Sequence, residues 1–449
     1  MTSEDQQAQA PTHSEQGPFS TRLSHKLIGK PPQSDLPNVE QNGLRFSTAF
    51  GFQNIGDQIM SAKTTLPWLL QMLAAPAWIA PLLVPIRESG SMLPQAGLRP
   101  WIQARSRRLP ILLLGTLGQA LGCIIAMCAA LFTSGTAAGL LILFGLALLA
   151  ASRSLVSLTS KDIQGRTMPK GYRGRVTGFA TTLAGAVTIV VGLIIAALRD
   201  SLSPGTFGVL FAAGAGAWLV SFLLFKGIQE PLVDEEDFAE PPHSFVEMNR
   251  AIWDDVWGLV RDDKPFRNFV LVRSLMLASA LSPTFLVTLQ GRAGSSVTGL
   301  GLFVVAAGLA SLAAGRVSGA LSDKSSKNTL SGGALFAVVL LLITIGLALA
   351  WEDALYWWLP VAFFGISVAH AAIRVSRSTY VVDMAEGDQR TRYVSVSNTL
   401  MGIILLLIGA LTALLSLMGT LWALGALAAF GALGSLLAAK LPEVSARQN

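Results

Sequence analysis

The chain has 449 residues, of which 52% are apolar and only 13% are charged, and its mean hydropathy is +0.54. Soluble domains average about one charged residue in four, so this composition excludes an ordinary soluble protein and indicates one that crosses a membrane several times. The formal net charge of +6 is carried mainly between the apolar runs, which is typical of membrane topology, so we expect no nucleic-acid partner.

Residues 1–44 are rich in glutamine, serine and proline and contain no apolar run. We predict a disordered cytoplasmic tail here and no signal peptide, because a signal peptide needs a continuous apolar stretch. After this tail, apolar runs long enough to span a bilayer follow one another almost to the end of the chain. Twelve membrane helices are predicted, at 47–70, 74–96, 110–132, 136–157, 174–198, 204–226, 266–290, 294–320, 329–350, 354–376, 393–417 and 419–440.

The first predicted helix carries polar side chains that lipid does not accept. At about 100° per residue, five of them fall within about a third of the helix circumference. They are Asn54, Asp57, Gln58, Ser61 and Thr65. Because an unpaired polar group in hydrocarbon costs several kcal/mol, this stripe must face protein or water. The five residues are therefore candidates for substrate binding or coupling along a solute pathway.

Asp57 lies near the middle of the first predicted helix, where its charge needs compensation. A carboxylate at that depth is either protonated or paired with a cation. Two arginines are candidate partners, Arg87 and Arg273; the latter stands in the second half of the chain at the place that corresponds to Asn54 in the first. A repeat of the two halves would turn both positions toward one cavity. Asp57 is either part of a fixed ion pair or is compensated by a proton, a sodium ion or a cationic substrate. If Arg273 is not paired with Asp57, it is a candidate anchor for an anionic substrate.

Further polar side chains lie in the predicted membrane helices. Glu88 is a second protonatable candidate nearer the inner interface. Lys63 lies opposite the polar stripe, where we expect it to pack against another helix or to reach toward a neighbouring polar group. His370 can titrate near neutral pH, although a lone membrane histidine is more often hydrogen-bonded to neighbouring helices; it corresponds to Arg153 of the first half. Thr284 shares a helix face with Arg273 and is predicted to bind substrate with it.

Basic residues follow every second apolar run. They are Arg99, Arg105, Arg107 and Arg108, then Lys161, Arg166, Lys170, Arg173 and Arg175, then Arg316, Lys324 and Lys327, and finally Arg374, Arg377, Arg390 and Arg392. The opposite loops hold only Arg199 and Arg292. By the positive-inside rule both termini are cytoplasmic, and we expect a multi-pass protein of the cell membrane, most simply a bacterial inner membrane.

A polar stretch at 227–265 divides the predicted helices into two sets of six, at 45–226 and 266–440, with a cytoplasmic tail at 441–449. Arg173 before the fifth helix matches Arg390 before the eleventh, and the pairs Asn54–Arg273 and Arg153–His370 have nearly the same separation. Two six-helix repeats related by an axis along the membrane normal are typical of secondary transporters, with the solute site between the halves.

The polar stretch itself contains a helix signal. Ser244-Phe-Val-Glu247 has the capping-box pattern, and the apolar residues that follow it share one face. We predict an amphipathic helix at 244–264 that lies along the inner membrane surface, with a protein-docking helix as the alternative.

The segment Gly319-Ala-Leu-Ser-Asp323-Lys-Ser-Ser-Lys327 resembles the signature of the major facilitator superfamily between helices 8 and 9, with Ser326 in place of a second glycine. Counting helices and repeats, the resemblance covers 45–440, and the segment VPIRESGSMLPQ is similar to a group of bacterial facilitator-type proteins. The resemblance implies an all-α membrane protein with twelve transmembrane helices in two pseudo-symmetric six-helix bundles. It further implies a cytoplasmic gate at Gly319, Asp323, Lys324 and Lys327, with Asp323 placed near Arg175. The first-half copy, from Glu88 to Arg108, is degenerate and has no aspartate in the expected place.

We therefore expect a secondary active transporter of a small solute that works by alternating access, with protons as the candidate coupling ion. An uncoupled facilitator is the first alternative, and a transporter-derived receptor or scaffold without transport is the second. The sequence contains no recognisable metal cluster, phosphate-binding loop or catalytic set, so we predict no enzyme activity and no cofactor. The expected partners are the solute and the lipid bilayer, and we expect a monomer.

Overall fold

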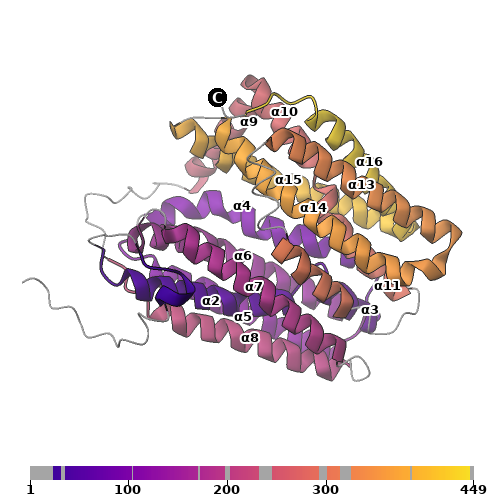
Figure 1. Ribbon diagram of the computed structural model, residues 1–449, viewed down its shortest axis with the longest axis horizontal. Helices are drawn as coiled ribbons and strands as arrows, with labels where there is room; N and C mark the ends of the chain where they lie inside the picture. Colours follow the sequence, from indigo (N-terminus) through magenta and orange to yellow (C-terminus); the bar gives the residue numbers. More distant parts are fainter. Residues whose placement is uncertain are drawn as a thin grey trace, which may run out of the picture.

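The structure, a computed structural model, describes residues 24–31, 36–103, 105–169, 172–197, 203–231, 245–292, 301–313, 325–384 and 387–444. These residues form helices joined by turns and short connections, and none of them belongs to a β-strand. The helices make two bundles, the first drawn in indigo to magenta and the second in orange to yellow (Figure 1). This arrangement confirms the predicted all-α class.

Each bundle begins with a helix that is broken inside the bundle. The first bundle consists of α2 (Val39–Ile59), α3 (Thr65–Met72), η1 (Ala80–Leu82), α4 (Leu83–Gln103), α5 (Leu109–Phe132), α6 (Gly135–Thr167), α7 (Tyr172–Ala197) and α8 (Pro204–Lys226). After α9 (Phe245–Asp262), the second consists of α10 (Lys264–Leu275), α11 (Ala278–Arg292), the helix Gly301–Ala313, α13 (Ser326–Ala350), η4 (Glu352–Ala354), α14 (Leu355–Asp383), α15 (Gly387–Met418) and α16 (Thr420–Ala438). The segments before the two breaks are capped at Met60 and Met276, which are separated along the chain almost as Arg173 and Arg390 are, as a repeat of two halves predicts.

The described helices suit a membrane. Eight stretches are long and apolar enough to cross it: α5, α6, α8, α10 with α11, α13, α14, α15 and α16. Large apolar side chains such as Phe132, Leu223 and Leu407 are exposed on their outer faces, where lipid can cover them. The multi-pass membrane architecture is confirmed. The number twelve stays a prediction, because α2 and α4 are more polar and Gly301–Ala313 is short.

The first predicted membrane helix, at 47–70, has wrong boundaries. The helix starts earlier, at Val39, ends at Ile59 and resumes as α3. The break falls in a stretch of mixed polar and apolar residues, Ile59-Met-Ser-Ala-Lys-Thr-Thr65, which contains no glycine or proline, so no local signal marked a helix end. Two carbonyl groups near the break find side-chain donors: Thr65 Oγ1 donates to the Gln58 oxygen (3.1 Å) and Arg87 Nη1 to the Met60 oxygen (3.4 Å). Polar backbone groups in a membrane need such partners.

Part of the predicted disordered tail is ordered. Residues 39–44 belong to α2, whose Val39 is buried, and the Asn42 amide exchanges hydrogen bonds with the Gln229 backbone (3.1 and 3.2 Å). Further back, the Ser24 hydroxyl lies 3.2 Å from that of Tyr172. Specific polar partners in the first bundle therefore hold this segment. Residues 1–23 and 32–35 lie outside the described residues.

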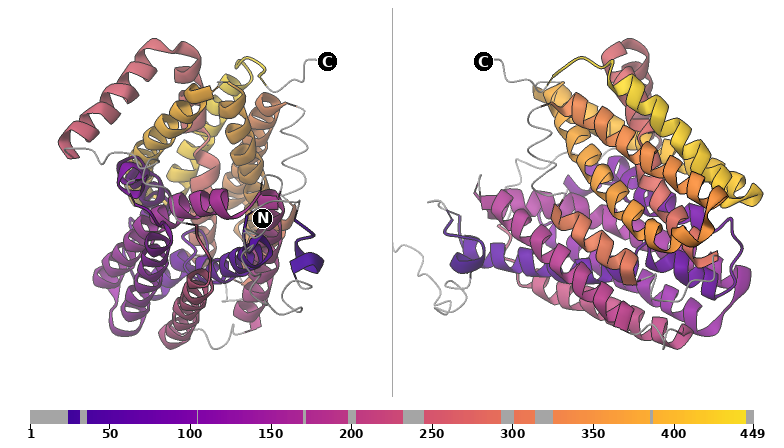
Figure 2. Two further views of the ribbon diagram at one scale, coloured as in Figure 1. Left: turned by 90° about the vertical axis from the view of Figure 1, so that its left-hand side faces the viewer. Right: turned by 45° about the vertical axis from the view of Figure 1, so that its right-hand side comes forward.

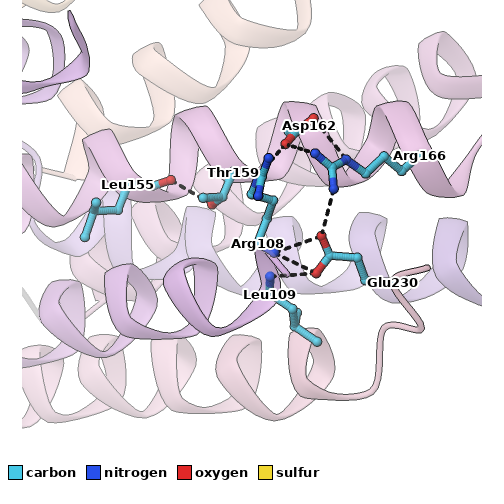
Figure 3. A network of polar contacts seen from close by, with 7 residues as sticks. All are labelled: Arg108, Leu109, Leu155, Thr159, Asp162, Arg166 and Glu230. Atoms are coloured by element: carbon cyan, nitrogen blue, oxygen red, sulfur yellow. Dashed lines mark hydrogen bonds and ion pairs between the residues drawn. The ribbon is translucent and has the colours of Figure 1, made fainter. Parts of the chain in front are cut away.

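A polar network joins three segments of the first bundle at one end (Figure 3). Glu230, just after α8, accepts from the backbone N–H groups of Arg108 (2.9 Å) and Leu109 (2.8 Å) at the start of α5. Asp162 of α6 pairs with both Arg108 and Arg166 at 2.8 Å. A carboxylate at a helix N-terminus also interacts favourably with the helix dipole. Residues in the degenerate first-half copy of the signature thus hold this bundle together.

The predicted amphipathic helix at 244–264 is present as α9. Val256 and Leu259 are buried against the second bundle, whereas Trp253 and Trp257 are exposed. The helix contacts α4 as well as α15, and in the left view of Figure 2 one of its ends extends beyond the bundles. Asp263 then caps α10 by accepting from the Phe266 N–H at 2.9 Å. That α9 lies along a membrane surface stays a prediction.

The two bundles meet along close seams. The helix α15 packs against α4, and α7 packs against Gly301–Ala313. A Cβ atom at Gly402 or Gly409 of α15 would lie 2.7 Å from Leu93 or 2.2 Å from Pro85 of α4, closer than real contacts allow. Glycine at these positions lets the backbones approach, as small residues do in membrane helices.

Candidate functional site

A cavity of about 900 Å³ lies between the two bundles. The first bundle lines it with α2, α4, α6 and α7, and the second with α11, Gly301–Ala313, α14 and α15. The lining residues of α6 begin at Arg153 and those of α14 extend to Arg377, so the cavity lies toward the end of the bundles where α2 begins and α14 ends. We call this the terminal end and the opposite one the far end. The volume is within the range of about 300–1,000 Å³ that is typical of small-molecule sites.

The far end is closed by contacts between the halves. The helix α3 packs against α11, and one hydrophobic core joins Leu69 and Leu70 to Phe285 and other residues of α11. Gln71 Nε2 donates to the Thr288 oxygen at 3.4 Å. The cavity is therefore shut on this side by packed side chains.

Thr284 belongs to this closure and not to the cavity wall. It is buried, and its hydroxyl donates to the Ala62 oxygen at 3.3 Å across the two halves. The prediction that Thr284 binds substrate is therefore wrong. Its face of α11 packs against the segment between α2 and α3. The neighbouring Pro283 does line the cavity.

The polar stripe of the first helix lies where the sequence predicts it. Asn54, Asp57, Gln58 and Ser61 line the cavity. Asn54 Nδ2 also donates to the Ala184 oxygen of α7 at 2.8 Å. Thr65 is buried beyond the helix break and is not part of the cavity wall, since the break changes the direction of the face it was predicted to share.

Asp57 is shared by two arginines of its own half. One carboxylate oxygen accepts from Arg87 Nη2 of α4 at 2.8 Å, and the other pairs with Arg153 Nη1 of α6. The Asp57 side chain is only 12% exposed. Two guanidinium groups on one carboxylate leave one positive charge in excess. The predicted alternative of an Asp57–Arg87 pair is therefore correct but incomplete, because Arg153 was visible only as a polar residue in an apolar helix.

Arg273 does not face Asp57, so the predicted Asp57–Arg273 alternative is wrong. Its buried guanidinium donates to Ser397 Oγ (2.7 Å) and Asn398 Oδ1 (2.8 Å) of α15. Arg273 lies three residues before the break cap Met276, as Asp57 lies three before Met60. Counted from the breaks, Arg273 therefore corresponds to Asp57 and not to Asn54 as predicted, and it packs inside the second half against α15 instead of lining the cavity.

One face of α14 carries cations that the sequence assigned to loop topology. His370, Arg374 and Arg377 follow the spacing i, i+4, i+7 and all line the cavity. The helix continues to Asp383, so both arginines lie within it and not in the loop beyond it. His370 Nδ1 lies 3.2 Å from the Ser279 hydroxyl, which fits the hydrogen-bonded histidine of the alternative interpretation. The helical spacing with His370 was the signal that could have revealed the two arginines.

Lys63 and Glu88 also line the cavity. Lys63 stands in the break between α2 and α3, where the helical wheel of a continuous helix no longer applies. Of its two predicted placements, packing against another helix and reaching toward a neighbouring polar group, the second fits this position in the polar cavity wall. Glu88 follows Arg87 in α4 and lines the same cavity as Lys63. Within the described ranges, no ion pair shorter than 4.0 Å joins the two side chains.

Most of the predicted gate lies outside the described residues. This holds for Gly319, Asp323 and Lys324 and for the side chain of Arg175. Lys327 is half-buried in the first turn of α13. The gate therefore remains a prediction from the resemblance. Among the described residues, no three His, Cys, Asp or Glu side chains gather to hold a metal ion.

Comparison with known families gives one match. The model of a family described as Major Facilitator Superfamily matches residues 92–365. That range begins within α4 and ends within α14, so it covers part of each half and the linker between them. No curated protein sequence has significant similarity to the chain.

Solved membrane transporters share the fold at low sequence identity. A D-xylose-proton symporter has a TM-score of 0.69 at 12% identity, over 90% of this chain and 98% of its own. A nucleoside transporter has a TM-score of 0.67 at 11% identity, over 89% and 99%. The inward-open xylose transporter XylE from E. coli has a TM-score of 0.64 at 13% identity, over 89% and 96%. At such identity these similarities establish the fold and not the solute.

Proposed function

Because the chain belongs to the Major Facilitator Superfamily, we propose that it is a secondary active transporter that moves a small solute by alternating access. The observation that carries the proposal is the cavity, which both halves line and which is closed at the far end by α3 and α11. Each chain supplies both walls, so a monomer is sufficient. A receptor or scaffold that moves nothing requires no such cavity between two halves.

We assign the terminal end to the cytoplasm. Arg108, Lys161 and Arg166 are gathered there, and positive charge is retained on the cytoplasmic side of membrane proteins. With this orientation the described conformation faces inward. The same argument supports the cell membrane, most simply a bacterial inner membrane, as the location.

Alternating access requires the far-end contacts to separate while the terminal end closes. The hydrogen bonds that must break are those from Gln71 to Thr288 and from Thr284 to Ala62, each between halves. Both are single bonds, so their loss costs about 1 kcal/mol each when water replaces the partner. At the seam between α4 and α15, glycine stands opposite Leu93 and Pro85, so the two helices remain closely packed there and can serve as the line about which the halves turn.

Asp57 is better suited to holding the first half together than to carrying protons. Its two arginines come from α4 and α6, so the triad moves as one body when the halves turn. Proton coupling, where it occurs, falls to Glu88, the other carboxylate in the described cavity wall. An uncoupled facilitator is the alternative that the fixed triad favours.

Alternating access can be tested without knowing the solute. The two native cysteines, Cys123 and Cys128, are first replaced by alanine. Ser157→Cys then places one thiol in the cavity wall, and an impermeant maleimide is applied to either side of oriented membrane vesicles. We expect labelling from both sides, because the cavity opens to each in turn.

A cross-link across the far end provides the decisive comparison. Gln71→Cys with Thr288→Cys, joined by a short bifunctional reagent, locks the closure. Labelling of Ser157→Cys from the far side should then stop while labelling from the terminal side continues; Gln71→Cys alone is the control. A protein that is labelled only from the terminal side before cross-linking is not a transporter of this kind.

The pH dependence of the same labelling tests proton coupling. Far-side labelling that varies with pH in the parent but not in Glu88→Gln supports a proton site at Glu88. Labelling that is independent of pH in both proteins supports an uncoupled facilitator.

A further inference from the structure

We propose that the cavity binds a small organic anion bearing a carboxylate or phosphate group, held by Arg374 and Arg377 of α14 and by Lys63 on the opposite wall. This inference rests on the proposed transport function and names the class of its solute. It is carried by the charges that line the cavity and by which of them already have partners.

The cavity wall is strongly basic. Its charged residues in the described ranges are the cations Lys63, Arg87, Arg153, Lys161, Arg374 and Arg377 and the carboxylates Asp57 and Glu88. Six cations and two carboxylates leave four positive charges (6 − 2). Charges at membrane depth are costly unless compensated, so this excess favours an anion inside the cavity.

Not all six cations are available to such an anion. Arg87 and Arg153 are bound to Asp57. Of the other four, Lys161 and Arg374 are exposed, whereas Lys63 and Arg377 are half-buried. Arg374 shares a face of α14 with Arg377, so Lys63, Arg374 and Arg377 form the candidate site. No hydrogen bond or ion pair within 4.0 Å joins any of these three to another residue in the part of the chain that the structure describes.

The three remaining cations are arranged for one ligand. Arg374 and Arg377 lie three residues apart, so their side chains are neighbours on one face of α14. Guanidinium groups bind carboxylate and phosphate through paired, charge-assisted hydrogen bonds. Lys63 belongs to the first half and α14 to the second, so an anion between them contacts both halves at once.

A role in membrane orientation alone explains the positions of Arg374 and Arg377 less well than anion binding does. Basic residues that only mark the cytoplasmic side extend to the interface, as long side chains near helix ends do. Arg377 is instead half-buried, although Arg374 is exposed. Both arginines are part of the cavity wall, within a helix that runs six residues beyond Arg377, to Asp383 (383 − 377).

The test uses the purified full-length protein and its thermal unfolding. Inorganic phosphate and succinate are the anionic probes, succinamide is the neutral probe, and chloride at equal ionic strength is the reference. We expect phosphate or succinate to raise the unfolding temperature saturably, since a ligand that binds the folded state stabilises it, and succinamide to have no effect. Arg374→Gln with Arg377→Gln should weaken the apparent affinity about tenfold or more, which is the effect of losing at least one charge-assisted contact.

Two further variants keep the result interpretable. Lys226→Gln with Lys440→Gln removes the same amount of charge from exposed positions outside the cavity and should respond like the parent. Arg374→Lys with Arg377→Lys retains charge and should bind with intermediate affinity, even if the glutamine variant folds poorly. The inference is overturned if neither anion stabilises beyond chloride, or if the double glutamine variant responds like the parent. Alternating labelling of Ser157→Cys without anion binding refutes the solute class alone; anion binding without alternation refutes transport alone.

Discussion

The two walls of the cavity hold arginine in different ways. On the first-half wall, Arg87 and Arg153 are both bound to Asp57, a carboxylate from the same bundle. On the second-half wall, Arg374 and Arg377 have no such carboxylate in ion-pair distance among the described residues. The comparison separates charges that maintain the fold from charges that are available to a solute, although all four line the same cavity.

The equivalent positions of the repeat sharpen this contrast. Three residues before each helix break, the first half has Asp57 and the second has Arg273. The first contacts two charged groups, and the second contacts two neutral ones, Ser397 and Asn398. Both halves therefore have a charged residue with polar partners at this position, but the charge is negative in the first half and positive in the second.

Asp57→Asn is expected to have the largest effect on stability. It leaves two guanidinium groups without their carboxylate, and breaking a buried ion pair in this way costs about 3 kcal/mol or more. Chemical or thermal unfolding of the purified protein measures the loss. The matched control is Glu88→Gln, which removes a carboxylate from the same wall but from no ion pair within 4.0 Å in the described structure. Equal losses in the two variants would contradict the distinction between paired and unpaired groups.

Arg273→Met is expected to have the next largest effect. It removes the donors of Ser397 and Asn398 and leaves these polar groups buried between α10 and α15, at a cost of about 2 kcal/mol. Arg273→Lys retains the charge and one donor and should lose less. Because Arg273 is not in the cavity wall, binding of phosphate or succinate should be unchanged in both variants. A weakened anion response would show that Arg273 reaches the solute after all.

Much of this site could be predicted from the sequence, but only within single helices. The angular spacing of Asn54, Asp57, Gln58 and Ser61 follows from helix geometry, so their common face was predictable. That Arg153, far along the chain from Asp57, shares this carboxylate with Arg87 depends on how α2, α4 and α6 pack, which no local pattern specifies.

The fold could be predicted where it depends on apolar length and not where it depends on backbone detail. Long apolar runs predicted the spans of α5, α6, α8 and α13, because only helices satisfy the backbone in lipid. The break after Met60 was not predictable from hydropathy. The sequence analysis counted Arg374 and Arg377 as topology charges at the end of the predicted helix 354–376, because basic residues there more often mark the cytoplasmic side of the membrane than line a binding site.

Arg153→Gln tests how much of the stability provided by the Asp57–Arg87–Arg153 group depends on Arg153. The Arg153 side chain is 37% exposed, so water screens its interaction with Asp57, and Arg87 remains bound. We expect a loss of only about 1 kcal/mol or less in the free energy of unfolding. A double-mutant cycle with Asp57→Asn measures the coupling between the two residues. A loss as large as that of Asp57→Asn would mean that Arg87 alone cannot hold the carboxylate.

Arg374→Gln should have the smallest effect on stability, and its sign is the sharpest test of the comparison. In low salt and without added anion, the arginine contributes repulsion with Arg377 and no ion pair within the described residues, so its removal should leave the unfolding temperature unchanged or slightly raised. The gain should disappear as salt screens the repulsion. Arg153→Gln, which removes the same charge from the same cavity, should instead lower the unfolding temperature. Arg153 has a carboxylate partner and Arg374 has none within ion-pair distance among the described residues. Changes of opposite sign in the unfolding temperature would support Arg374 as a charge available to a ligand. Changes of the same sign would indicate that both arginines stabilise the fold.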